Sequence, residues 1–259
     1  MLRQAFFIHR LIRIFLRKLH DHTSRRSDDL PGQENVLQSE RLDLLMVYGK
    51  LHFRGFLVHS GNSYHAKDRE DLVRIQKYAS ENLLRLKKHF QTQYPDMIIS
   101  VGDTPTCSQL PSAKGTDEIR PGNFVFFDVM QFALGSCRLE DIAVALICPV
   151  VATHPNRLQA VIYGGAIHLS KEQALLPPDP EPFFGLAVKW DGKSWYANQL
   201  LGKVSSLSQE HGIVSLTQQG FNLKPGDLVA ILPVHSCLTG NLMRKYLTLE
   251  GEVIETMNT

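Results

Sequence analysis

The chain has 259 residues, a formal net charge of +2 and 43% hydrophobic residues. This length allows one large domain or two of ordinary size, with enough apolar side chains to form a core. The near-balanced charge argues against nucleic acid as the main partner. The four cysteines form no Cys-x-x-Cys pair. We therefore expect reduced thiols in a cytoplasmic protein.

Residues 1–20 are basic and contain no acidic residue, and their apolar side chains recur at helical spacing. No apolar run approaches the roughly 20 residues of an integral membrane span, and no secretory cleavage site follows. Three interpretations remain open: a basic amphipathic surface helix, a transit-like leader, or a stretch foreign to the ancestral fold. Residues 21–40 are polar with a Pro-Gly break and are predicted to be a linker.

The segment that follows shows the alternation of a parallel α/β sheet. Two short apolar runs, 51–58 and 97–101, are predicted strands, and each leads into a polar loop. Between them, apolar residues at steps of three and four predict a helix that begins near Asp68 and ends near Phe90. Catalytic groups in such folds lie in the loops that follow the strands.

After residue 112 the pattern changes to short β-rich runs separated by turn signals. The predicted strands include 124–127, 142–151, 160–163, 185–190, 212–216 and 228–232. No long helix interrupts them. This part is therefore expected to be an antiparallel β domain, either a barrel or a sandwich.

The lengths of these regions limit the architecture. A complete eight-fold (β/α) barrel needs about 250 residues and one βαβ unit about 30. The predicted fold class is therefore α/β plus β, with an incomplete (β/α) barrel remnant followed by an antiparallel β domain. We divide the chain into an N-terminal extension and linker, partial barrel units and a β domain, at 1–40, 41–112 and 113–259.

The segment 223–242 holds a pair of potential metal ligands. A Pro-Gly turn and an apolar strand lead to His235 and Cys237, which at strand periodicity would face the same side. Zinc normally takes three or four ligands. The others would have to come from elsewhere in the fold, a partner chain, water or substrate.

Polar residues after the two predicted parallel strands are further candidates. Gly102 allows close backbone approach, and Thr104 before Pro105 suits a helix N-cap, so free N–H groups there could hold a phosphate. Asp103 opposes this because a carboxylate repels phosphate, and an ordinary strand-to-helix turn is the alternative. Tyr64 could lie on a planar ligand, donate its hydroxyl or shield an apolar edge.

Other polar residues are less informative. Glu210 and His211 could supply acid–base groups or form a plain surface turn between strands. Asp128, Gln131 and Cys137 lie in or beside the stretch MQFALGSC. Their residue types alone assign them no role.

Five stretches, in order, together resemble the C-terminal half of the D-threonine aldolase and D-serine dehydratase family. These enzymes use pyridoxal phosphate and have the alanine-racemase-like fold, a (β/α)8 barrel followed by a β domain. The resemblance extends from about residue 51 to the C-terminus. The stretches are FRGFLVHSGNSY, IISVGDTPT, DEIRPGNFVFFDVMQFALGSC, SQEHGIVSL and LKPGDLVAILPVHSCLTGNL.

The resemblance implies a cofactor, a metal and a substrate class. Gly102, Asp103 and Thr104 would bind the phosphate of pyridoxal 5'-phosphate, and Tyr64 would lie against the cofactor. His235 and Cys237 would hold zinc or another divalent metal. The substrate would be a small D-3-hydroxy amino acid, in D-serine dehydration or D-threonine retro-aldol cleavage. The His-x-Cys form is more similar to the zinc-dependent D-serine dehydratases.

The sequence also departs from the family. Asn62 stands where a second loop histidine is usual, and Asp103 where serine is usual, which weakens the expected affinity for phosphate. The Schiff-base lysine lies in the family's first barrel strand, and nothing in residues 1–50 matches its motif. Lys67 follows a later strand and does not replace it. No catalytic residue is therefore assigned.

These departures lead us to expect weak or no activity from this chain alone. A fragment of a longer enzyme and a reduced homologue would both explain the pattern. The alternative function is a non-catalytic β module that binds metal or a partner. A truncated barrel would leave strand edges unpaired, so we expect self-association, for example as a homodimer.

Overall fold

A computed structural model of the chain describes residues 53–256. The predictions for the N-terminal extension, the linker and the first residues of the strand at 51–58 lie outside these residues. Residues 54–256 belong to one compact unit. No helix among residues 53–256 is long and apolar enough to cross a lipid bilayer.

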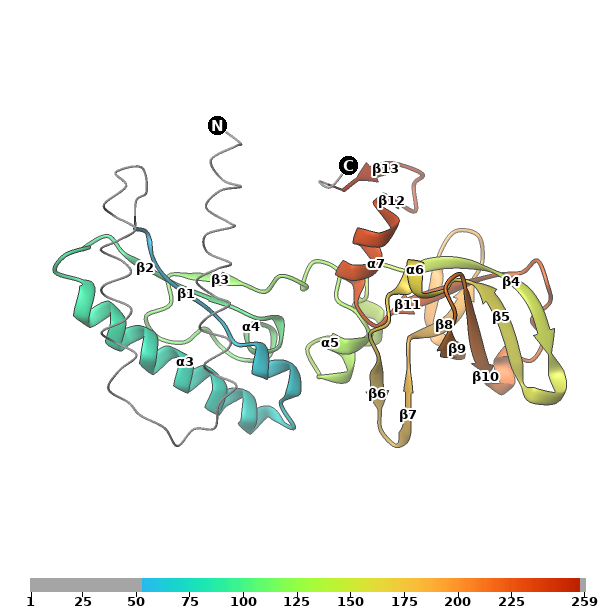
Figure 1. Cartoon of the computed structure of the whole chain (residues 1–259), viewed down its shortest axis with the longest axis horizontal. Coiled ribbons are helices and arrows are strands. Elements are labelled where there is room, and N and C mark those ends of the chain that lie inside the picture. The colour runs from blue at the N-terminus through green and yellow to red at the C-terminus, as the bar shows by residue number, and fades with distance from the viewer. Residues whose placement is uncertain (1–52, 257–259) are drawn as a thin grey trace. The chain divides into compact units, whose positions relative to one another are not determined.

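A three-stranded parallel sheet opens this unit, with strand order β1-β2-β3 (Figure 1). Parallel neighbours need a crossover, and the long helix α3 supplies the one between β1 and β2. The predicted βα alternation is confirmed, with strand bounds shifted by a few residues. The elements are β1 (Gly55–His59), η1 (Gly61–His65), α3 (Arg69–Phe90), β2 (Ile98–Gly102), α4 (Thr104–Gln109) and β3 (Glu118–Arg120).

Helix α3 begins where the sequence predicts it. The Asp68 carboxylate accepts a hydrogen bond from the backbone N–H of Asp71 at 2.8 Å, which caps the helix. Basic residues in the last turn suit the negative end of the helix dipole. At that end the Phe90 ring lies 5.5 Å from the ring of Phe56 on β1. The helix is thereby fixed on the sheet that carries the two candidate loops.

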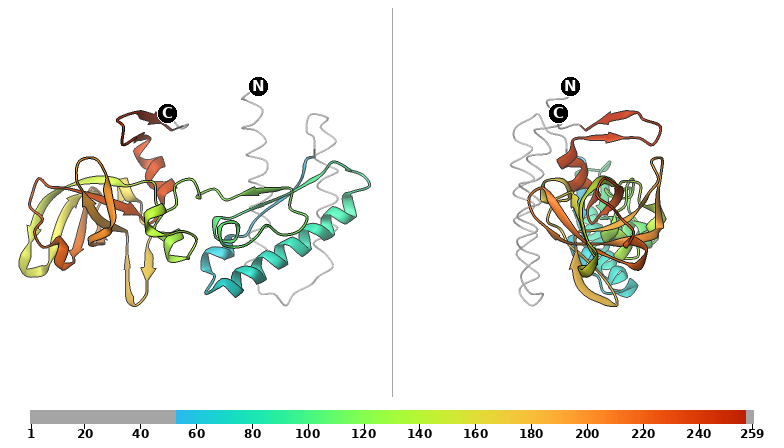
Figure 2. Two further views of the ribbon diagram at one scale, coloured as in Figure 1. Left: turned by 180° about the vertical axis from the view of Figure 1, so that it is seen from behind. Right: turned by 90° about the vertical axis from the view of Figure 1, so that its right-hand side faces the viewer.

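The β domain is a closed barrel with strand order β10-β5-β4-β11-β8-β9, and neighbouring strands are antiparallel (Figure 2). Closure pairs the edges of every strand. The predicted β-rich domain is therefore confirmed as a barrel. Its strands are β4 (Leu146–His154), β5 (Gln159–Tyr163), β8 (Gly185–Trp190), β9 (Trp195–Leu207), β10 (His211–Leu216) and β11 (Leu228–Pro233).

Strand β11 is buried on both faces, which explains its uninterrupted apolar sequence. Val229 and Ile231 pack into one hydrophobic cluster of the β domain. Ala230 and Leu232 point to the opposite side and pack into a second cluster. Because the strand is packed on both faces, it holds the start of the following segment, which contains His235, in a fixed position.

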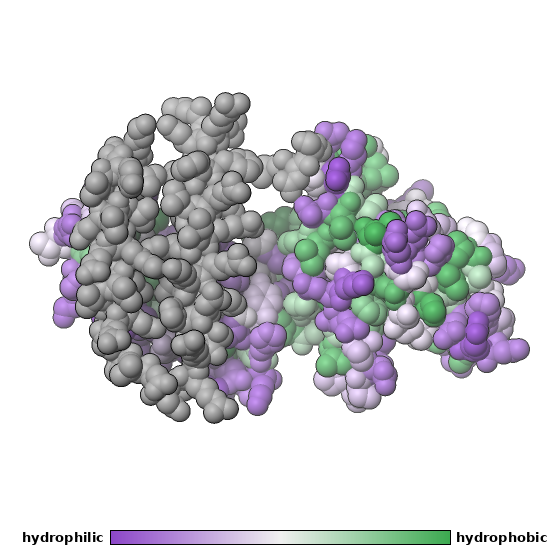
Figure 3. All heavy atoms as spheres, viewed as in Figure 1, coloured by the Kyte–Doolittle hydropathy of each residue, from purple (hydrophilic) through white to green (hydrophobic). Residues whose placement is uncertain are grey.

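Short elements complete the domain. On the face shown in Figure 3, hydrophobic and hydrophilic side chains are interspersed over the β domain. The remaining elements are α5 (Val129–Ala133), η2 (Leu139–Asp141), η3 (Pro155–Arg157), α6 (Ala166–Leu169), β6 (Ala174–Leu176), β7 (Asp179–Phe183), η4 (Gln218–Gly220), α7 (Ser236–Met243), β12 (Lys245–Leu247) and β13 (Val253–Glu255).

One sequence expectation needs correction, and one boundary can be proposed anew. The apolar run 124–127 is a turn and not a strand, because the Asn123 carbonyl accepts from the N–H groups of both Phe126 and Phe127. Strand β3 pairs with β2 beyond the predicted boundary at residue 112. We therefore propose that the junction between the barrel units and the β domain lies after Arg120.

We expect Gly202→Ala to lower the free energy of unfolding by about 1–3 kcal/mol. Gly202 pairs with both neighbours of β9, and a Cβ there would collide with the backbone carbonyl of Ser215. Gly122→Ala is the control because its Cβ would meet nothing within 4 Å. That control should change stability by less than about 0.5 kcal/mol. Equal denaturant midpoints for the two variants would contradict the packing described for β9.

Candidate functional site

His235 and Cys237 lie at a strand-to-helix junction. Strand β11 ends at Pro233 and α7 begins at Ser236, so His235 immediately precedes the helix and Cys237 lies in its first turn. The expectation that strand periodicity aligns the pair is therefore wrong. The two side chains are nevertheless brought together, because the imidazole forms a hydrogen bond with the Cys237 sulfur.

A carboxylate fixes the orientation of the imidazole. His235 Nδ1 lies 3.0 Å from Oε2 of Glu172, a residue between α6 and β6. The hydrogen bond with Cys237, followed by that with Glu172, raises the pKa of His235 to about 9. A carboxylate on one imidazole nitrogen commonly orients the other nitrogen toward a metal. Glu172 is a functional candidate that the sequence did not reveal, since it lies 63 residues from His235.

The pair supplies one nitrogen and one sulfur donor. No group of three His, Cys, Asp or Glu side chains suited to a metal occurs within residues 53–256. A zinc ion bound here would therefore need further ligands from solvent, substrate or another chain segment. Two protein ligands are fewer than the four of a closed structural zinc site and the three of a typical catalytic one.

The loop after β2 differs from the phosphate cup that the sequence suggested. Asp103, and not Thr104, is the N-cap of α4. Its carboxylate accepts hydrogen bonds from the Thr106 backbone N–H at 2.8 Å and from the Thr106 hydroxyl at 2.7 Å. The carboxylate thereby occupies the helix N-terminus, and burial raises the pKa of Asp103. Thr104 Oγ1 instead accepts the backbone N–H of Asn123 at 3.0 Å.

Tyr64 lies beside this loop. It is half-buried in η1 and forms hydrogen bonds with the side chain and backbone of Thr104. Burial raises the pKa of Tyr64. The structure therefore brings Tyr64, Asp103 and Thr104 together.

Arg120 explains the glycine at position 102. A Cβ on Gly102 would lie 2.9 Å from Nη1 of Arg120, so the guanidinium needs that space. Arg120 Nε donates to the Ser100 hydroxyl at 2.7 Å, and Nη2 donates to the Val58 carbonyl at 2.9 Å. The Arg120 side chain on β3 thus links the ends of β2 and β1 by hydrogen bonds.

Asp128 is a second buried acid, and its side chain is only 1% exposed. It caps α5 by accepting the Gln131 N–H at 2.9 Å. It also accepts the Ser236 N–H at 3.1 Å and a hydrogen bond from the Asn123 side-chain amide. Burial raises the pKa of Asp128. The contact with Ser236 joins residues 108 positions apart, so local sequence patterns could not reveal it.

Glu210 and His211 lie near a different group of rings. The His211 ring is 5.6 Å from the ring of Tyr163, which is in turn 5.1 Å from the ring of His168. Glu210 and His211 are exposed near the start of β10. The structure assigns them no acid–base function.

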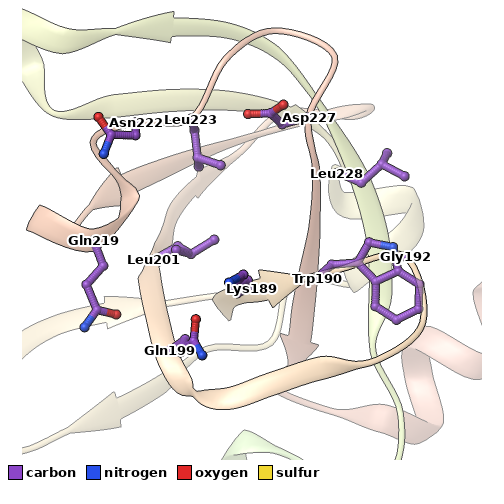
Figure 4. Close-up of a pocket in the computed structure, with 10 residues that line it drawn as sticks. All are labelled: Lys189, Trp190, Gly192, Gln199, Leu201, Gln219, Asn222, Leu223, Asp227 and Leu228. Atoms are coloured by element: carbon purple, nitrogen blue, oxygen red, sulfur yellow. The ribbon is translucent and has the colours of Figure 1, made fainter.

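A cavity of about 700 Å³ lies on the barrel near the β8–β9 turn (Figure 4). Its lining includes Trp190, Gln199, Gln219, Asn222 and Asp227. None of the candidate site residues named above lines it. The cavity is therefore separate from the candidate site.

Curated proteins share this sequence pattern. Residues 143–249 match the family model described as "Putative serine dehydratase domain". The chain is 32% identical over 238 residues to D-serine dehydratase of Dictyostelium discoideum, which covers 85% of this chain and 58% of that protein. It is 24% identical over 237 residues to D-threo-3-hydroxyaspartate dehydratase of Delftia sp., covering 86% and 61%. The chain thus spans about three fifths of the length of these relatives.

Solved structures share the fold. The chain superposes on D-threo-3-hydroxyaspartate dehydratase from Delftia with a TM-score of 0.72 and 22% identity, covering 90% of this chain and 62% of that one. An alanine racemase-like protein from Idiomarina loihiensis gives a TM-score of 0.69 and 24% identity, covering 89% and 61%. The predicted resemblance is therefore confirmed: the chain has the alanine-racemase-like fold and is similar in sequence to D-serine dehydratases, with the family model matching residues 143–249.

Proposed function

We propose that the chain carries the metal-binding half of a pyridoxal-phosphate- and metal-dependent lyase site for D-3-hydroxy amino acids. The reaction would be D-serine dehydration or D-threonine retro-aldol cleavage. The observation that carries the proposal is the contact between His235 and Cys237, with the Glu172 carboxylate on His235 Nδ1. The similarity to dehydratases supports it.

A related enzyme supports the metal assignment. D-threo-3-hydroxyaspartate dehydratase has been solved as a histidine-to-alanine variant and as a cysteine-to-alanine variant in the metal-free form. The two substituted positions lie two residues apart in that enzyme, the spacing of His235 and Cys237 here.

The donor set of the pair fits zinc. An imidazole nitrogen and a thiolate sulfur are both common zinc ligands, and the carboxylate behind the imidazole is a usual supporting group. A zinc ion held by His235 and Cys237 would act as a Lewis acid toward a substrate hydroxyl. Glu172 would keep the imidazole in the orientation that binds the metal.

The phosphate of pyridoxal phosphate fits less well. The Asp103 carboxylate holds the N–H of Thr106 that an anion would otherwise approach, and its negative charge would repel phosphate. Tyr64 is only half-buried and can contact the cofactor, whereas Thr104 is fully buried and would act through its hydrogen bonds to Tyr64. The proposal therefore gives these two residues a positioning role and assigns no proton transfer to the cofactor side.

A second candidate is a non-catalytic β module that binds metal or a partner. The Asp103 carboxylate at the N-terminus of α4 favours it. Both candidate functions include metal binding by His235 and Cys237. A homodimer and a reducing, cytoplasmic setting for the four unpaired cysteines belong to the proposal in either form.

We expect the purified chain to bind zinc, and His235→Ala and Cys237→Ala each to weaken binding by about 100-fold, or about 2.8 kcal/mol. Each variant removes one of two protein ligands. Zinc content by elemental analysis and affinity by chelator competition measure this. His154→Ala, at the end of β4, is the control and should bind as the wild type does. Unchanged zinc binding in both site variants would remove the proposed metal site.

We expect Asp103→Ser to strengthen the binding of pyridoxal phosphate at least about tenfold, or about 1.4 kcal/mol. Serine can still cap α4 but carries no charge beside the phosphate. Equilibrium binding followed by absorbance gives the affinities. Pyridoxal, which lacks the phosphate, is the matched ligand and should bind both proteins equally. An equal gain for both ligands would show that charge repulsion is not the cause.

Product assays separate the two candidate functions. We expect slow pyruvate release from D-serine that requires both zinc and pyridoxal phosphate, and that Cys237→Ala abolishes. Glycine release from D-threonine would instead indicate the retro-aldol reaction. If the chain binds zinc but neither binds pyridoxal phosphate nor releases either product, the non-catalytic module is correct and the lyase proposal is wrong for this chain.

A further inference from the structure

We propose that Asp128 is a positioning residue: it holds His235 and Cys237, the proposed metal ligands, in a fixed position relative to Tyr64 and Thr104. The inference rests on the proposed function in one respect, namely that His235 and Cys237 are the metal ligands. It concerns a residue that touches neither the metal nor the cofactor. The structural basis is a continuous path of hydrogen bonds between the two sides.

The Asp128 carboxylate joins three segments of the chain. It accepts the N–H of Gln131 in the first turn of α5, the N–H of Ser236 at the start of α7, and the side-chain amide of Asn123. The carboxylate is almost fully buried, so these donors replace the water that it has lost. Removing it would leave three donors without their acceptor.

Two further bonds tie the same segments together around His235. The Met130 N–H donates to the Val234 carbonyl at 3.2 Å, on the N-terminal side of His235. The Ser236 hydroxyl donates to the Phe127 carbonyl on its C-terminal side. With the bond from the Ser236 N–H to Asp128, these contacts fix the backbone on both sides of the imidazole.

Asp128 also determines where α7 begins. The first N–H groups of a helix have no partner within the helix. At Ser236 that partner is the Asp128 carboxylate, while His235 keeps an extended backbone with φ −135° and ψ 99°. Cys237 is thereby placed in the first helical turn, within hydrogen-bond reach of the imidazole.

The path continues toward the cofactor side. Asn123 donates its side-chain amide to Asp128, and its backbone N–H donates to Thr104 Oγ1 at 3.0 Å. Thr104 is in turn hydrogen-bonded to Tyr64. Asn123, Thr104 and Ser236 are all buried, so the path is protected from solvent. A displacement of Asp128 would therefore change the positions of both the His235–Cys237 segment and the Thr104–Tyr64 contact.

The test is Asp128→Asn in the full chain. Asparagine keeps the shape but turns one acceptor oxygen into a donor, which must face one of the three donors. We expect a 10–100-fold loss of zinc affinity, the range found when a residue that supports a metal ligand is replaced. The cobalt(II) form should also show an altered thiolate-to-cobalt charge-transfer band, since Cys237 moves relative to His235.

Asp191→Asn is the matched control. Asp191 also accepts three hydrogen bonds, from the N–H groups of Lys193 and Ser194 and from the Tyr196 hydroxyl, but it lies in the turn between β8 and β9. The zinc affinity and the cobalt(II) spectrum of the Asp191→Asn variant should equal those of the wild type. If Asp128→Asn folds and matches the wild type in both measurements, the positioning role is wrong.

A second variant covers the case in which Asp128→Asn does not fold. Asn123→Ala removes one donor to Asp128 but keeps the backbone N–H to Thr104. We expect zinc affinity to fall several-fold and the Ser236 amide to exchange its hydrogen at least tenfold faster than in the wild type. If both quantities are unchanged, the inference is overturned.

The amide measurement also distinguishes the two levels of the proposal. A wild-type chain that binds no zinc would refute the proposed metal site. The exchange rate of the Ser236 amide would still decide whether Asp128 holds this backbone. Fast exchange in the variant with slow exchange in the wild type supports the positioning role, and equal rates reject it.

Discussion

The hydrogen bonds to the buried Asp128 carboxylate are the interaction on which the candidate site depends. Strand β11, packed on both faces, brings the chain rigidly to Val234. After Val234 the Asp128 carboxylate accepts the Ser236 N–H and thereby stabilises the first turn of α7. The position of His235 and Cys237, the proposed metal ligands, thus depends on the barrel core and on one buried carboxyl group. Neither the strand nor the helix alone would place His235 beside Cys237.

Two buried acids have opposite consequences for function. Asp128 supports the metal side, because its donors come from the segments that carry the pair. Asp103 works against the cofactor side, because it takes the N–H and hydroxyl of Thr106 at the helix N-terminus. The proposed metal site therefore fits these contacts better than the proposed phosphate site does. This asymmetry is the physical reason for expecting a metal site with weak catalysis.

Local patterns made much of the fold predictable from the sequence. Strand β8 and helix α3 with its Asp68 cap were found because apolar spacing and capping chemistry are local. Strand β9 was missed because shifts in its register break the alternation. His235 and Cys237 were found from their residue types. Glu172 and Asp128 could not be assigned roles, since their partners lie 63 and 108 residues away.

The most direct test of the account is X-ray absorption at the zinc edge of the zinc-loaded chain. The account predicts one sulfur and one imidazole nitrogen bound to the metal, with the remaining ligands nitrogen or oxygen. The single sulfur should disappear in Cys237→Ala. A spectrum without sulfur, or with two or more sulfur ligands, would contradict a site built on His235 and Cys237.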